Sequence, residues 1–163
     1  MIRTLEGVKS YYVKEDGTAF SWGCFFIRPN GLFVAHTDYG TYGYHWPVDE
    51  DFNFLRFLAN TKDKEYLLSK ISRKTHLNED KTRKAFLQYV IAMRREDLIS
   101  KERTRELYRG IREAETGEAL IAWGMEQREL SDCYEMARYE YPIDARMFVE
   151  RLFPILQEQL KTE

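Results

Sequence analysis

The sequence predicts an α+β fold in which an antiparallel sheet comes first and helices follow. Between about residues 8 and 46, apolar and aromatic residues alternate with other residues between turn signals, as they do in strands. From about residue 50 to residue 161, apolar residues recur at helical spacing behind residues that cap helix N-termini. A length of 163 residues without repeats or linkers favours a single domain over residues 1–163.

Turn residues divide the first region into an antiparallel meander of three or four strands. The breaks are Asp16-Gly17, Arg28-Pro29-Asn30-Gly31 and Asp38-Tyr39-Gly40, in which glycine tolerates positive φ and Pro29 presets φ. Between the first two breaks, one face of the strand is strongly aromatic and consists of Phe20, Trp22, Cys24 and Phe26. We interpret this face as buried, and therefore expect Cys24 to be buried.

The helical region contains its own start and break signals. Asn78 and Ser100 stand where N-caps are expected, each in front of an apolar stripe. In the last helix, Phe148, Leu152 and Leu156 form the predicted inner face. Pro154 lies inside this helix and should kink or divide it, because proline has no N–H to donate.

The composition fits a globular protein of a reducing compartment. Hydrophobic residues make up 44% and charged residues 32% of the chain. Cys24 and Cys133 are isolated, which favours free thiols over a disulfide. No apolar run approaches the length of a membrane span, and the first residues do not resemble a signal peptide. We therefore expect a cytoplasmic protein without membrane contact.

The densest group of potential binding residues lies between His36 and Trp46. We take as the candidate binding set the residues Asp38, Tyr39, Tyr42, Tyr44, His45 and Trp46. Tyrosine and tryptophan provide large contact areas at low entropic cost, which suits binding surfaces. The alternative is that the aromatic residues at 42, 44 and 46 form the buried face of an edge strand.

The charged residues are unevenly distributed. Residues 73–115 carry a net charge of +4, and residues 116–163 carry −5. The basic run from Arg94 to Arg112 could contact nucleic acid through phosphates, which is our second functional hypothesis. Acidic residues such as Glu102 and Glu106 interleave this run, so the alternative is an ordinary helix face neutralised by ion pairs.

The sequence contains no recognised catalytic or cofactor motif, and we expect no cofactor. His36, Asp38 and His45 could form a metal set for a hydrolase, because imidazole and carboxylate groups suit zinc or iron. No ligand spacing typical of a metal site supports this third hypothesis. We therefore expect a non-enzymatic protein.

Two stretches resemble parts of small accessory proteins of tailed bacteriophages and prophages. The first runs from Thr37 to Trp46 and follows a Gly-Leu-Phe-Val strand, and the second covers residues 92–95 and 100–108. The resemblance implies a gene context and a location in the bacterial host cell, but no chemistry. It favours a non-enzymatic protein that binds a host protein and inhibits a host defence system. The oligomeric state stays open.

Overall fold

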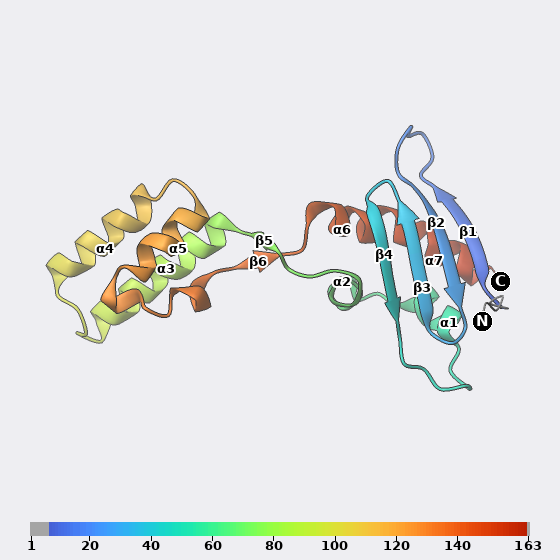
Figure 1. Cartoon of the computed structure of the whole chain (residues 1–163), viewed down its shortest axis with the longest axis horizontal. Helices are drawn as coiled ribbons and strands as arrows, with labels where there is room; N and C mark the ends of the chain where they lie inside the picture. The colour runs from blue at the N-terminus through green and yellow to red at the C-terminus, as the bar shows by residue number, and fades with distance from the viewer. Residues whose placement is uncertain (1–6, 163) are drawn as a thin grey trace, which may run out of the picture. The chain divides into compact units, whose positions relative to one another are not determined.

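The chain folds into two compact units, shown in a computed structural model that describes residues 7–162 (Figure 1). The first, here the sheet unit, comprises the chain up to Arg73 and from Tyr141 onward. The second, here the helical unit, comprises Lys74–Glu140 and is therefore inserted between two parts of the first. Strands precede helices, which confirms the α+β prediction. Within the described residues, no helix combines the length and apolar content needed to cross a bilayer.

The predicted meander is confirmed and has four strands. β1 (Lys9–Lys14), β2 (Trp22–Arg28), β3 (Leu32–Thr37) and β4 (Gly40–His45) form an antiparallel sheet in that order. The β2–β3 turn requires glycine, because Gly31 has a φ of +95° and an added Cβ would lie 2.0 Å from the Trp46 carbonyl oxygen. The Trp46 N–H donates to the Gly31 carbonyl at 2.9 Å.

One face of the sheet is covered by helices and forms the first core. These helices are α1 (Phe54–Asn60), α2 (Lys64–Ile71), α6 (Ile143–Met147) and α7 (Phe153–Lys161). The core centres on Phe25, Phe33 and Phe148, none of which is exposed. A π-helical segment, Phe148–Leu152, separates α6 from α7 just before Pro154. Proline cannot donate a backbone hydrogen bond, so the interruption expected at Pro154 is present.

The helical unit has a core of its own. It contains α3 (Glu79–Arg95), α4 (Lys101–Glu113), α5 (Gly117–Met125) and the short 3₁₀ segments Arg128–Leu130 and Cys133–Met136. The side chains of Asn78 and Ser100 cap α3 and α4, as predicted. At the base of the unit, β5 (His76–Leu77) pairs antiparallel with β6 (Tyr139–Glu140). The chain therefore enters and leaves this unit along one short ladder.

The two cores consist of different residues, although we expected one domain over residues 1–163. Phe148 and Leu152 belong to the sheet-unit core, and Phe86 and Leu120 belong to the helical-unit core. A single domain in the thermodynamic sense unfolds in one cooperative step. That expectation stays a prediction, and the separate cores favour two steps.

Candidate functional site

Asp38, the first residue of the candidate binding set, supports the backbone of a loop. Its carboxylate accepts hydrogen bonds from the backbone N–H groups of Ser21 and Trp22, the latter at 3.2 Å. Ser21 is buried and has a positive φ of 70°, a conformation that few residues other than glycine adopt without strain. Asp38 therefore holds the end of the β1–β2 loop against the β3–β4 turn.

Tyr39, Tyr42 and Trp46 belong to the core side of the sheet. Tyr42 stacks on Phe148 with ring centroids 4.6 Å apart, and its hydroxyl donates to the Tyr39 carbonyl at 2.7 Å. Trp46 is 5% exposed and donates its indole N–H to the Tyr66 hydroxyl at 2.9 Å. Tyr39 packs against the same core, so these three side chains support the fold.

Tyr44 and His45 lie on opposite faces of β4, as their neighbouring positions require. Tyr44 is partly buried, and the Lys70 ammonium lies 5.6 Å from its ring centroid. His45 is exposed on the face that the helices leave uncovered. Of the candidate set, His45 is therefore the residue best placed to meet a partner.

The proposed metal set does not come together. His36 hydrogen-bonds through Nδ1 to the Thr41 hydroxyl at 3.0 Å, whereas His45 pairs with Leu32 at the other end of β3. The Asp38 carboxylate is occupied by two backbone N–H groups. Within residues 7–162, no group of three or more His, Cys, Asp or Glu side chains is placed to hold a metal ion. This geometry lends no support to the hydrolase hypothesis.

An aromatic surface that sequence reasoning misassigned lies on the uncovered face of the sheet. We call it the outer sheet face and define it by Tyr12, Trp22, Cys24, Phe26, Val34 and His36. The strand register places Tyr12, Cys24 and His36 in one row across β1, β2 and β3. Tyr12 is 60% exposed and Phe26 is 43% exposed. The expected burial of the aromatic face of β2, and of Cys24 with it, is therefore wrong.

The helices explain this reversal. Both faces of β2 are apolar, but Phe25 and Ile27 are the residues that the helices bury, with 0% exposure. Trp22, Cys24 and Phe26 consequently point away from the core. Trp22 meets the His36 ring edge-on at 5.7 Å, so the partly exposed tryptophan is held in place. Cys24 is a partly exposed free thiol on this face.

Basic residues accompany the aromatic residues of the outer sheet face. By strand alternation, Lys14, Arg28 and His45 point to the same side as Tyr12 and Phe26. None of the outward positions of β1 to β4 is occupied by Asp or Glu. The surface is therefore aromatic with a basic rim, and it suits an acidic partner surface with apolar contacts at its centre.

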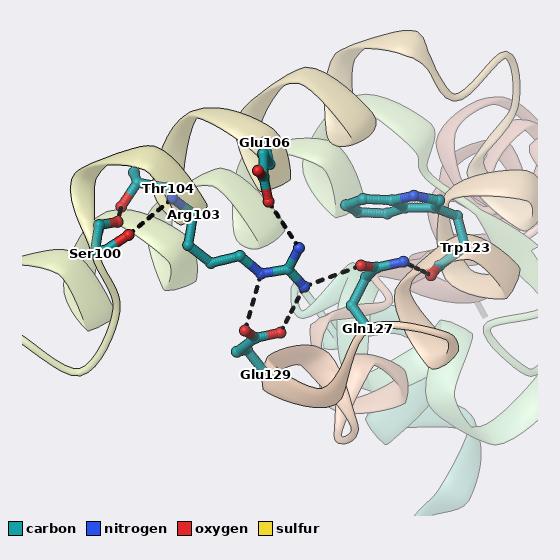
Figure 2. Close-up of polar contacts among 7 residues, drawn as sticks. All are labelled: Ser100, Arg103, Thr104, Glu106, Trp123, Gln127 and Glu129. Atoms are coloured by element: carbon teal, nitrogen blue, oxygen red, sulfur yellow. Dashed lines mark hydrogen bonds and ion pairs between the residues drawn. The ribbon is translucent and has the colours of Figure 1, made fainter.

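In the helical unit, ion pairs engage part of the basic run from 94 to 112, and Figure 2 shows the contacts of Arg103. Arg103 donates to both carboxylate oxygens of Glu129, at 2.9 and 2.8 Å, and also reaches Glu106 and Gln127 at 3.1 Å. These contacts raise the pKa of Arg103 and lower the pKa of Glu129. Arg94 pairs with Asp97 at 2.6 Å. Arg103 is thus a structural clamp between α4 and the segment after α5.

Cys133 has the environment of an inert thiol. It is fully buried in the helical-unit core, and its sulfur contacts the Ile121 carbonyl at 3.6 Å. Burial raises the pKa of the Cys133 thiol, and the nearby Asp132 carboxylate raises it further. Since thiolates are the reactive form, this cysteine is unsuited to nucleophilic catalysis.

The fold defines an α+β protein whose sheet exposes aromatic side chains on the face that the helices leave uncovered. The chain belongs to the phage protein family Phage_phiTE_072, which matches residues 3–162. The suspected relation to phage accessory proteins is consistent with this finding. Comparisons with curated proteins and with solved structures gave no match.

Proposed function

We propose that this phage protein is non-enzymatic and binds a host protein through the outer sheet face. The observation that carries the proposal is the exposure of Tyr12 and Phe26 beside the partly exposed Trp22 on a sheet face without helices. Large aromatic side chains are the usual anchors of protein interfaces, whereas they add little to stability when exposed.

The basic rim specifies the chemistry of the partner. Lys14, Arg28 and His45 surround the aromatic residues, and no carboxylate from the four strands opposes them. A partner with apolar pockets framed by Asp and Glu would be complementary in both shape and charge. A phage protein meets such partners in the cytoplasm of its bacterial host, and components of host defence systems are the first to test.

The proposal predicts which exposed tyrosine matters. Tyr12 and Tyr134 are 60% and 61% exposed, but only Tyr12 lies on the outer sheet face. Tyr12→Ala should weaken binding of the captured host protein by at least about tenfold, a truncation cost typical of interface anchors. Tyr134→Ala should change binding by less than about twofold. The measurement is affinity capture from bacterial lysate with the full-length protein, followed by titration of the identified partner.

Three outcomes would contradict the proposal. Equal binding by wild type, Tyr12→Ala and Phe26→Ala would place the binding surface elsewhere on the molecule. Capture of nucleic acid alone would replace the host protein with another class of partner. Tyr12 would have a structural role if Tyr12→Ala lowered the free energy of unfolding by as much as it weakened the free energy of binding.

A further inference from the structure

The exposed side of α4 carries its charges in two separate rows. Lys101, Arg105, Tyr108 and Arg112 recur at intervals of four, three and four residues, which places them in one stripe along the helix. The next stripe has the same spacing and contains Glu102, Glu106, Arg109 and Glu113. All eight residues are exposed. We call the first stripe the basic row and the second the acidic row.

The cations of the basic row have no carboxylate partner within the described part of the chain. Arg94 and Arg103 form ion pairs with Asp97 and Glu129, whereas Lys101, Arg105 and Arg112 form none. An ordinary solvated helix face neutralises its charges through pairs at i, i+4. On α4 the rows are instead segregated, so within the described residues the basic row presents three cations without an ion pair over about 16 Å of helix.

We propose that the basic row of α4 contacts the phosphate backbone of duplex DNA. Three cations in a straight stripe can each meet a phosphate oxygen, and Tyr108 can donate its hydroxyl to a fourth group. This inference is independent of the outer sheet face, because it concerns a different unit and a different chemistry.

Two observations select a duplex over a single strand. Single-strand binding relies on aromatic faces that stack on bases, and α4 exposes only Tyr108. The Arg112 guanidinium lies 5.9 Å from the centroid of the Tyr108 ring, so that face is already occupied. The basic row therefore provides phosphate contacts without a stacking platform.

The acidic row limits how the helix can approach the duplex. If α4 entered a groove deeply, Glu102 and Glu113 would face the phosphates of the second strand and be repelled. B-form DNA separates its strands across a major groove of about 12 Å, so an acidic row over the groove avoids phosphates. The narrow major groove of A-form RNA brings the second strand closer. The geometry therefore favours binding to DNA, along one backbone and independent of base sequence.

The test measures binding of full-length protein to a fluorescein-labelled 20-base-pair DNA duplex between about 50 and 200 mM salt. Three phosphate contacts predict that log Kobs falls with log salt at a slope of about −2.7. Arg105→Gln should reduce the magnitude of that slope by about 0.9. Arg109→Gln is the matched control on the acidic row of the same helix and should leave the slope unchanged. The triple variant Lys101→Gln/Arg105→Gln/Arg112→Gln should bind at least about tenfold more weakly.

Any of four results would overturn this inference. They are no duplex binding by wild type at about 50 mM salt, wild-type binding by the triple variant, an equal change of slope in Arg109→Gln, and tighter binding to a 20-nucleotide single strand. All substituted residues are exposed, and thermal unfolding checks that each variant is folded. Tyr12→Ala should bind the duplex normally, which separates this test from that of the host-protein surface.

Discussion

At the scale of single residues, the aromatic side chains of β4 show how burial and hydrogen bonding assign a role. Tyr42 buries its ring against Phe148 and still satisfies its hydroxyl through the Tyr39 carbonyl. Burial, with a smaller contribution from the Asp144 carboxylate, raises the pKa of Tyr42 to about 12. The neutral phenol is thus the form that the folded state favours.

This shift predicts a loss of stability at high pH. Below pH 10 the Tyr42 phenol is neutral in both the folded and the unfolded state, so its contribution to the free energy of unfolding is complete. Above pH 10 the unfolded chain ionises first, and stability falls until the folded-state pKa of about 12 is reached. We expect about 2 kcal/mol of the free energy of unfolding to be lost in this window through Tyr42. Urea unfolding at pH 9 and pH 11.5, compared with Tyr42→Phe, measures the difference.

Tyr42→Phe should be less dependent on pH over that range, although it loses one hydrogen bond at neutral pH. Tyr12→Phe serves as the control, because Tyr12 is exposed. An identical pH dependence of wild type and Tyr42→Phe would show that the Tyr42 phenol does not titrate between the two states as expected.

At the scale of the element, the position of α4 depends on a close approach and on an ion-pair cluster. An added Cβ at Gly110 would lie 2.1 Å from the Trp123 ring, so α4 and α5 touch at this glycine. Arg103 then joins the first turns of α4 to Glu129, as Figure 2 shows. These contacts face α5 and the segment after it, which leaves the charged rows of α4 directed away from the core.

The Arg103–Glu129 pair predicts acid sensitivity of the helical unit. The pKa of Glu129 lies below its ordinary value of 4.5, because the Arg103 guanidinium donates to the carboxylate. The contribution of the Arg103–Glu129 pair to the free energy of unfolding is therefore complete above about pH 4.5. It is lost as the pH falls through the lower pKa that Glu129 has in the folded state. Because the pair is partly exposed, we expect it to contribute about 1 kcal/mol to the free energy of unfolding.

Urea unfolding of wild type and Glu129→Gln at pH 7 and pH 3 measures this effect. The difference in stability between the two proteins should be present at pH 7 and small at pH 3. Glu115→Gln is the control, because Glu115 is exposed and forms no ion pair within the described residues. A constant difference at both pH values would assign the cost to packing rather than charge.

At the scale of the whole molecule, the residues that form the sheet unit are not continuous along the chain. The sheet unit is completed only by α6 and α7, after the helical unit has been inserted between Arg73 and Tyr141. The insertion begins and ends at the β5–β6 ladder, where the Asn78 N–H donates to the Arg138 carbonyl at 2.7 Å. Each unit buries its own apolar residues. A substitution that creates a cavity in one core can therefore destabilise that unit without destabilising the other.

Two buried leucines test whether the units unfold separately. Leu152 and Leu120 are both 0% exposed, the first in the sheet unit and the second in the helical unit. Each Leu→Ala change should cost about 2–5 kcal/mol. We expect two calorimetric transitions. Leu152→Ala should lower the midpoint temperature of one of them, and Leu120→Ala should lower the midpoint temperature of the other. A single transition lowered by both variants would instead support one cooperative domain over residues 1–163.

Much of the local structure was predictable from the sequence, because it depends on neighbouring residues. The turn at Gly31, the caps at Asn78 and Ser100, and the interruption before Pro154 all follow from backbone preferences. Period-two and helical spacing similarly predicted the order of strands and helices. The opposite orientation of Tyr44 and His45 on β4 depends only on their being neighbours in a strand.

Only the tertiary structure decided which surfaces are free. Strand β2 is apolar on both faces, and the packing of Phe148 against Phe25 left Phe26 exposed and Trp22 partly exposed. Likewise, nothing in the local sequence distinguishes Arg103 from Arg105, since both belong to the same charged run. Glu129, 26 residues away along the chain, pairs with Arg103 only because the fold brings the two together. Burial and ion pairing depend on residues that are distant along the chain, whereas alternation and capping depend on adjacent ones. The sequence therefore determined the elements, and the packing of those elements determined the candidate sites.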